Sequence, residues 1–295
     1  MDYAAPTTVA EASQALADHP NARVFAGATD LIPQIRSGRP EPGLVVDLKR
    51  IERLTSIAEG DDHWTVGAAT PTARLTANPA FSSMFPGLSE AAGLIGSDQI
   101  QNRSSLGGNL CNASPAADSV PALIANGVRA VVASPSGERT MPVADVVTGP
   151  GANSLGADEF IVEFEIDKPP PKTSDAYLRM TPRTEMDIAV VGAGVRLTLD
   201  DDGRCSDATI VLGAVAPTAV RVPDAEAALV GSTLDDEALG AVAAAASAAC
   251  NPIDDKRGTI EYRTQVAGVL AKRAVLAAAD RIANPSTNLP NGNLT

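Results

Sequence analysis

A run rich in glycine, serine and asparagine at residues 98–121, DQIQNRSSLGGNLCNASPAADSVP, constrains this chain more than any other segment. It has few side chains to bury, so its role must depend on its backbone. Glycines such as Gly107 and Gly108 permit positive φ and let a ligand approach the main chain closely. Successive N–H groups in such a turn can bind an anion. Because the same residue types also build ordinary surface turns, the run by itself favours a plain loop.

A second glycine-containing turn lies upstream, at residues 26–30 (AGATD). The elements predicted around it are a helix that starts at the capping-box pair Thr8 and Glu11, a strand at 22–25, a helix at 31–36 and a strand at 44–48. The turn therefore lies where a strand passes into a helix N-terminus, where free N–H groups and the helix dipole favour a phosphate. A plain strand–helix connection is the alternative.

The composition and charge of the chain argue against several classes of protein. The 295 residues are enough for two or three domains. A formal net charge of −13 argues against a nucleic-acid-binding protein, and it fits either adaptation to high salt or simple solubility. The N-terminus lacks the regions of a signal peptide, and no apolar stretch reaches membrane-spanning length. We therefore expect a cytoplasmic enzyme or enzyme subunit.

The cysteines and histidines do not form a recognisable catalytic or metal-binding pattern. Cys111, Cys205 and Cys250 are widely separated, so they make no disulfide framework and no four-cysteine iron–sulfur site. For Cys111 an inert thiol is favoured over a redox role, because no base or resolving cysteine is nearby. His19 and His63 lie in loop-like sequences without metal-ligand spacing. A Ser-His-Asp hydrolase or a zinc enzyme is disfavoured, and we predict no catalytic or metal-binding residue.

The predicted elements divide the chain into parts of the α+β class. Residues 1–54 form a first unit and residues 55–166 a second one. A proline-rich linker at 167–175 follows, because three prolines fit neither a helix interior nor a central strand. Residues 176–283 form a C-terminal α+β domain with a small antiparallel sheet and helices. The tail, 284–295, is predicted to be disordered.

Hydrophobic patterning and turn residues give the expected elements of the second and third units. In the second unit they are a hairpin at 54–58 and 64–68, helices at 72–77 and 87–94, a helix start at 118–126, and strands at 129–134 and 159–166. In the third unit they are strands at 175–180, 188–199 and 208–216, followed by helices at 224–230, 235–249 and 260–281.

Together these motifs resemble one family. AGATD at 26–30 and SLGGN at 105–109, which continues to NASPAAD, resemble the flavin-binding medium subunit of molybdenum hydroxylases. The likeness continues beyond the linker, in Tyr177, Leu178, Arg179, Arg183, Asp187, Ile188 and Ala189, in residues 251–258 and in residues 261–263. It covers nearly residues 2–283. The family includes the medium subunit of aerobic carbon monoxide dehydrogenases and the FAD-binding subunit of xanthine dehydrogenases.

The resemblance implies a two-subdomain FAD-binding fold of the PCMH or vanillyl-alcohol-oxidase type, with non-covalent FAD between the first two units. The pyrophosphate would be cradled by Ala26, Gly27, Ala28, Thr29 and Asp30 and by Ser105, Leu106, Gly107, Gly108 and Asn109. Leu31 would lie beside them, Asp118 would be an acidic contact and Arg179 a basic one, and Ile95 and Ile161 would pack near the rings.

Several of these implied contacts have an ordinary structural alternative. Ile95 and Ile161 also suit plain core positions. Arg179 and Arg183 also suit surface salt bridges. Ala28 departs from the Gly-Gly form of the family's first turn and fits there if its φ is negative. A dianionic pyrophosphate in a chain of charge −13 needs local donors, which the glycine turns and Arg103 or Arg179 supply.

The resemblance also implies a function and partners. Substrate would be oxidised at a molybdopterin centre on a large subunit, and electrons would pass through two [2Fe-2S] clusters of a small iron–sulfur subunit to FAD and on to an external acceptor. A dimer of such heterotrimers is implied, in the cytoplasm or peripheral at the inner face of the membrane through the complex. The flavin carries the redox chemistry, so this chain needs no acid–base catalyst.

Two other functions remain open on the residues alone. A stand-alone FAD oxidase or dehydrogenase of the same fold would call for an anchoring His or Cys and for catalytic Tyr or His residues, of which this chain has few. A non-catalytic assembly protein would be expected to have damaged glycine turns, whereas Gly27, Gly107 and Gly108 are intact.

Overall fold

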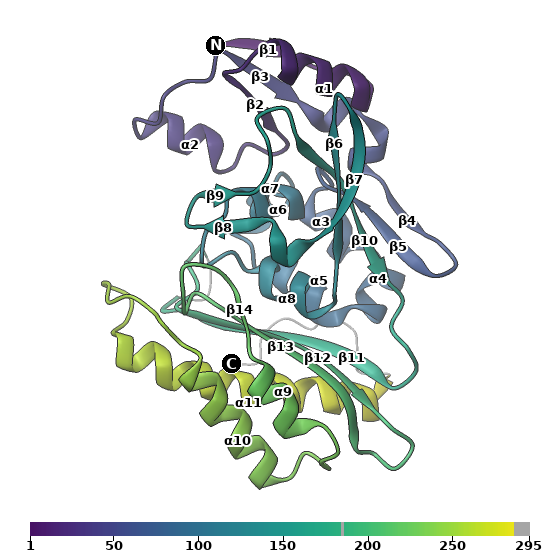
Figure 1. Ribbon diagram of the computed structural model, residues 1–295, viewed down its shortest axis with the longest axis vertical. Helices are drawn as coiled ribbons and strands as arrows, with labels where there is room; N and C mark the ends of the chain where they lie inside the picture. The colour runs from purple at the N-terminus through teal and green to yellow at the C-terminus, as the bar shows by residue number, and fades with distance from the viewer. Residues whose placement is uncertain (184–185, 286–295) are drawn as a thin grey trace.

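The structure is a computed structural model, and it describes residues 1–183 and 186–285. Figure 1 shows three units in chain order along the long axis, with the N-terminal unit at one end and the C-terminal helices at the other. The predicted α+β class is confirmed. Of the tail predicted to be disordered, residues 286–295 lie outside the described part of the chain.

The first unit is a three-stranded parallel sheet with two helices. Its strands are ordered β1 (Asp2–Ala4), β3 (Leu44–Asp47) and β2 (Ala22–Phe25), and its helices are α1 (Val9–Asp18) and α2 (Leu31–Arg36). The predicted cap of α1 is confirmed, since Thr8 Oγ1 accepts from the Glu11 N–H at 3.2 Å. Buried residues of α1 and β3 share a core with Phe160 and Val162 of the second unit, so the two units pack as one body.

The second unit is an antiparallel five-stranded sheet covered by short helices. The strand order is β4 (Ile57–Glu59), β5 (His63–Gly67), β10 (Phe160–Asp167), β6 (Arg129–Ser134) and β7 (Gly137–Pro142). The helices are α3 (Thr72–Thr76), α4 (Pro79–Met84), α5 (Pro86–Gly93), α6 (Asp98–Gln101), α7 (Leu106–Cys111) and α8 (Ser119–Ala125). A small hairpin of β8 (Val147–Gly149) and β9 (Ala152–Asn153) completes it, with 3-10 turns η1 (Leu48–Arg50), η2 (Glu52–Thr55) and η3 (Val143–Asp145) alongside.

The third unit is a four-stranded antiparallel sheet between two layers of helices. The strands run β11 (Thr173–Met180), β12 (Val191–Leu199), β13 (Cys205–Gly213) and β14 (Val220–Arg221). Helices α9 (Pro223–Leu229), α10 (Asp236–Ala248) and α11 (Ile260–Ala283) lie on one side, and α5 and α8 of the second unit lie on the other (Figure 1). The second unit is thereby anchored to the third through this sheet.

Several expected elements differ from the structure in detail. The strand predicted at 54–58 begins only at Ile57, because residues 52–55 form η2. Helix α4 was not predicted, although Asn78 caps it by accepting from the Phe81 N–H at 3.1 Å. The glycine run was expected to be a loop, but residues 106–111 form α7.

The junction between the second and third units is held by buried charged groups. Strand β11 begins at Thr173, inside the range 167–175 that the prolines suggested for a linker. Asp175, only 3% exposed, accepts from the N–H groups of Gly87 and Leu88 at 2.9 and 2.8 Å and so caps α5. Arg281 of α11 pairs with Glu90 of α5. A residue assigned to the linker is therefore part of the domain interface.

Candidate functional site

A cavity of about 380 Å³ lies between the first and second units. Its walls come from the turn after β2, from α2, from α7 and from the start of β10, and its volume is in the range of roughly 300–1,000 Å³ typical of small-molecule sites. Most of the residues predicted to contact a cofactor line it: Ala26, Gly27, Ala28, Thr29, Asp30, Leu31, Ile95, Ser105, Gly107, Gly108, Asn109 and Ile161. Leu106, Asp118 and Arg179 do not.

The first glycine turn (residues 26–30) offers a row of free hydrogen-bond donors. The backbone N–H groups of Gly27, Ala28, Thr29 and Asp30 have no hydrogen-bond acceptor among the described residues. All four residues line the cavity. Unpaired main-chain N–H groups require a partner from solvent or ligand, and a row of them forms a concavity that suits an anion.

The first glycine turn is packed tightly against the second unit. A Cβ atom on Gly27 would lie 1.8 Å from the carbonyl oxygen of Arg103, so only glycine fits there. The next residue, Ala28, has a φ of 58°, so the condition under which alanine would fit there without strain, a negative φ, is not met. An L-residue in this region is strained by about 1–2 kcal/mol, which the surrounding contacts must offset. The turn is thus a fixed, strained structure.

The second glycine segment (residues 105–109) is the first turn of α7. Ser105 caps this helix, since its hydroxyl accepts from the Gly108 N–H at 3.1 Å. The Gly107 N–H donates to the Ala68 carbonyl at 3.1 Å, and a Cβ there would lie 2.6 Å from the same oxygen. A Cβ on Gly108 would meet only the Ser105 hydroxyl, at 3.3 Å. The N–H groups of these two glycines are therefore already bonded, and what the segment offers a ligand is open space beside the main chain at Gly108. Leu106 points into the hydrophobic core.

Asp118 and Arg179 form a buried pair behind the wall of the cavity. Arg179 Nη1 lies 2.8 Å from Asp118 Oδ2, and the Tyr177 hydroxyl donates to Asp118 Oδ1 at 2.9 Å. Burial raises the pKa of the Asp118 carboxyl to about 6, although Arg179 acts in the opposite direction. The pair joins the start of α8 to β11, and a direct contact of either residue with a cofactor stays a prediction.

Asn109 connects the cavity wall to this pair. Its Oδ1 accepts from the Ser119 hydroxyl at 2.7 Å and from the Ser119 N–H at 3.3 Å. Ser119 directly follows Asp118, so a continuous chain of polar contacts joins α7 and α8 to β11. The side chain of Asn109 thereby holds α7 in place.

Two cavity residues that the sequence patterns did not single out bridge its walls. Gln34 of α2 donates through Nε2 to Asn112 Oδ1 at 2.9 Å, and Arg39 donates to Gln34. Gln34 lies one turn after Asp30 on the predicted helix, so its spacing could have placed it on the same side as the turn. Asn112 follows α7, and its role needed the tertiary structure.

Cys111 also lines the cavity, and it fits the inert thiol that the sequence favoured. Burial raises the pKa of its thiol to about 12, so the thiol stays protonated at neutral pH. Within residues 1–183 and 186–285, His, Cys, Asp and Glu side chains form no group that could hold a metal ion. None of the described helices combines the length and hydropathy that crossing a bilayer needs.

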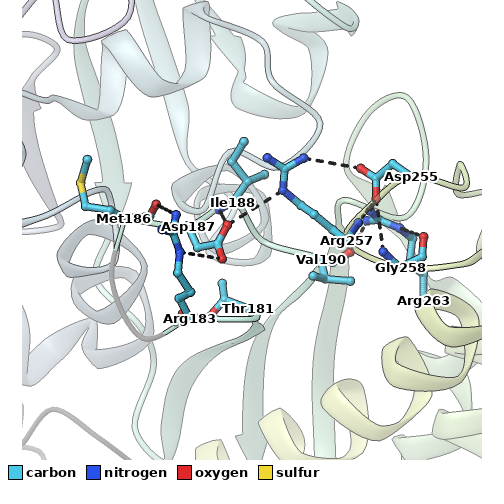
Figure 2. A network of polar contacts seen from close by, with 10 residues as sticks. All are labelled: Thr181, Arg183, Met186, Asp187, Ile188, Val190, Asp255, Arg257, Gly258 and Arg263. Carbon is cyan, nitrogen blue, oxygen red and sulfur yellow. Dashed lines mark hydrogen bonds and ion pairs between the residues drawn. The ribbon is translucent and has the colours of Figure 1, made fainter.

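Beyond the linker, the family-like segment at residues 177–189 lies next to the family-like residues at 251–263. Figure 2 shows Asp187 between Arg183, at 3.4 Å, and Arg257, at 3.9 Å. Buried Arg263 donates to the Val190 carbonyl at 2.6 Å and pairs with Asp255 at 2.7 Å. Of the two arginines considered for surface salt bridges, Arg183 makes one, whereas the pair of Arg179 is buried. Residues 184 and 185 lie outside the described residues.

Comparisons with known proteins agree with this architecture. Residues 1–169 match the family described as the FAD binding domain in molybdopterin dehydrogenase, and residues 176–278 match the CO dehydrogenase flavoprotein C-terminal domain. The chain is 33% identical to the 6-hydroxypseudooxynicotine dehydrogenase complex subunit alpha of Paenarthrobacter nicotinovorans, covering 95% of each chain. It is also 33% identical to the carbon monoxide dehydrogenase medium chain of Hydrogenophaga pseudoflava, over 96% of this chain and 98% of that one.

The solved structures show the same likeness. Carbon monoxide dehydrogenase from Hydrogenophaga pseudoflava, in a form that lacks the Mo-pyranopterin moiety of the molybdenum cofactor, superposes with a TM-score of 0.91 at 34% identity. The superposition covers 95% of this chain and 98% of that one. Together with the cavity and its two glycine segments, these matches show that the chain belongs to the family of FAD-binding medium subunits of molybdenum hydroxylases.

Proposed function

We propose that the cavity binds FAD non-covalently and that the chain is the electron-transfer subunit of a molybdenum hydroxylase complex. The observation that supports this most directly is the row of free N–H groups at residues 27–30 on the cavity wall. In a chain of net charge −13, a pyrophosphate needs such local donors. The open space beside Gly108 lets a bulky ligand approach the opposite wall.

The residues proposed to hold FAD each contribute in a different way. Residues 27–30 donate N–H groups to the pyrophosphate. Gly107 and Gly108 keep the facing wall free of side chains, and Ile95 and Ile161 offer apolar contacts. Asp30 reaches solvent, and desolvation raises the pKa of its carboxyl. When bound, FAD supplies the redox chemistry by accepting electrons and passing them to an external acceptor.

The partners follow from the same proposal. The described residues hold no cysteine-rich site for iron–sulfur clusters and no group that could bind a metal, so the clusters and molybdopterin would belong to other chains. We propose a small subunit with two [2Fe-2S] clusters and a large molybdenum subunit, assembled in the cytoplasm as a dimer of heterotrimers. The large subunit would recognise the substrate.

The test of flavin binding uses the full chain, alone or co-expressed with its partners. We expect stoichiometric, non-covalent FAD with yellow absorbance. Gly108→Val should abolish binding, because its side chain enters the space beside the main chain. Gly149→Val is the matched control, since a Cβ at Gly149 has no neighbour within 4 Å. A colourless protein that also fails to bind added FAD would refute the proposal.

A second experiment separates a subunit from a stand-alone flavoenzyme. The FAD-loaded chain is mixed anaerobically with xanthine, an aldehyde or carbon monoxide, and then with a chemically reduced iron–sulfur subunit. We expect the flavin absorbance to bleach only with the reduced subunit. Bleaching by substrate in the absence of a partner would favour the stand-alone oxidase or dehydrogenase.

A further inference from the structure

Lys49 contacts the start of the first glycine turn without lining the cavity. It belongs to η1, directly after β3. Its Nζ donates to the Ala26 carbonyl at 2.8 Å and to Asp47 Oδ1 at 2.6 Å, and it lies 4.1 Å from the centroid of the Phe25 ring. The ammonium group therefore joins the ends of β2 and β3 at the point where the turn begins.

The contact with Ala26 decides how the next peptide is oriented. The described peptide bonds are trans, and in a planar trans peptide the C=O and the following N–H point in opposite directions. With the Ala26 carbonyl directed to Lys49, the Gly27 N–H points away from Lys49. A flipped peptide would present an oxygen where the Gly27 donor now stands and would repel a phosphate.

Lys49 is itself held in a fixed position. Asp47, buried at 7% exposure, accepts from the Lys49 N–H at 3.0 Å as well as from its ammonium group. The Tyr3 hydroxyl donates to the other oxygen of Asp47 at 2.8 Å, which brings β1 into the same network. Because Asp47 neutralises Lys49, the ammonium group acts by orienting the turn and not by adding positive charge to the cavity.

We propose that Lys49 is a positioning residue of the FAD site, which fixes the Ala26–Gly27 peptide so that the N–H groups of the first glycine turn face the pyrophosphate. This inference rests on the proposed function. It assigns to Lys49 an effect on cofactor binding without any contact with the cofactor.

The test compares Lys49→Met with Lys49→Arg in the full chain. Lys49→Met keeps the length of the side chain and removes the donor, so we expect FAD affinity to fall about tenfold by fluorescence titration. Hydrogen exchange in the cofactor-free protein should rise in a peptide covering residues 24–31, through the end of β2 that pairs with β3, because the N–H groups of residues 27–30 are already free. Exchange elsewhere should stay unchanged. Lys49→Arg restores a donor and should recover most of the affinity.

Lys168→Met is the matched control, because Lys168 makes an exposed ion pair with Glu59. It should leave both measurements unchanged. Three results would overturn the inference: Lys49→Met binds FAD as tightly as the wild type; Lys49→Arg fails to recover affinity; or exchange rises across the whole first unit, which would mark a general loss of stability. If the wild type does not bind FAD, the proposed function fails first, and the inference fails with it.

Discussion

The first glycine turn and the second glycine segment face the same cavity but use glycine for different reasons. In the first turn, Gly27 allows contact with the Arg103 carbonyl, and the N–H groups of residues 27–30 stay free. In the second segment, the N–H groups of Gly107 and Gly108 are already bonded to Ala68 and Ser105. The first provides donors and the second provides space. Similar glycine signatures therefore do not imply equal contributions to anion binding.

The largest effect is expected for Gly27→Ala. The added Cβ would lie 1.8 Å from a backbone oxygen, so the turn must move as a whole and lose the alignment of its donors. We expect FAD affinity to fall by at least about 100-fold and the free energy of unfolding by about 1–3 kcal/mol. Fluorescence titration and denaturant unfolding measure the two.

Gly43→Ala is its control within the same unit, since a Cβ there meets only Asn21 Cβ at 3.7 Å. It should change neither quantity. If Gly27→Ala bound FAD normally, the free donors of the first glycine turn would not be the phosphate site, and the contrast between the two segments would disappear.

An intermediate effect is expected for the pair Gly107→Ala and Gly108→Ala. A Cβ on Gly107 would lie 2.6 Å from the Ala68 carbonyl, so we expect a loss of about 1–3 kcal/mol in the free energy of unfolding. Gly108→Ala has room in the cofactor-free protein, and alanine in a helix should stabilise it by about 0.5–1 kcal/mol. The free energies of unfolding of the two variants and the wild type are compared by thermal unfolding without FAD. Equal losses would mean that both glycines serve packing.

The smallest effect is expected for Ala28→Gly. Glycine removes the strain of about 1–2 kcal/mol at a φ of 58° but raises the entropy of the unfolded chain. We expect a net gain of about 0.5 kcal/mol in the free energy of unfolding and a change of less than about twofold in FAD affinity. A large gain in affinity would show instead that the alanine distorts the turn.

Local elements were predictable wherever patterning and turn residues agreed. The strands at 22–25 and 129–134 have the same bounds in the structure, and the helix expected to begin at residue 31 does begin there. Helix α7 was not foreseen, because two glycines disfavour a helix and only packing against Ala68 with the Ser105 cap offsets this. Asp175 was placed in a linker because its proline-rich neighbours gave no sign of the helix end that it caps.

The residues of the candidate site also fall into those that could be predicted from the sequence and those that could not. Most of the residues that the family resemblance indicated do line the cavity, since glycine turns at fixed spacing mark a close approach of the backbone. Asp118 and Arg179 instead turn toward each other, because α8 packs on β11 and buries both groups. Lys49 and Gln34 had no motif to mark them, and their roles depend on contacts with Ala26 and Asn112.

The order of the units and the two glycine turns could be predicted from the amino-acid sequence, because backbone conformation and the absence of a side chain are local properties. Which N–H groups remain free became clear only from the folded chain. Whether an N–H group is free depends on contacts with distant segments. The Ala68 carbonyl accepts from Gly107, the Arg103 carbonyl packs against Gly27, and the Lys49 ammonium group binds the Ala26 carbonyl. No local pattern contains that information.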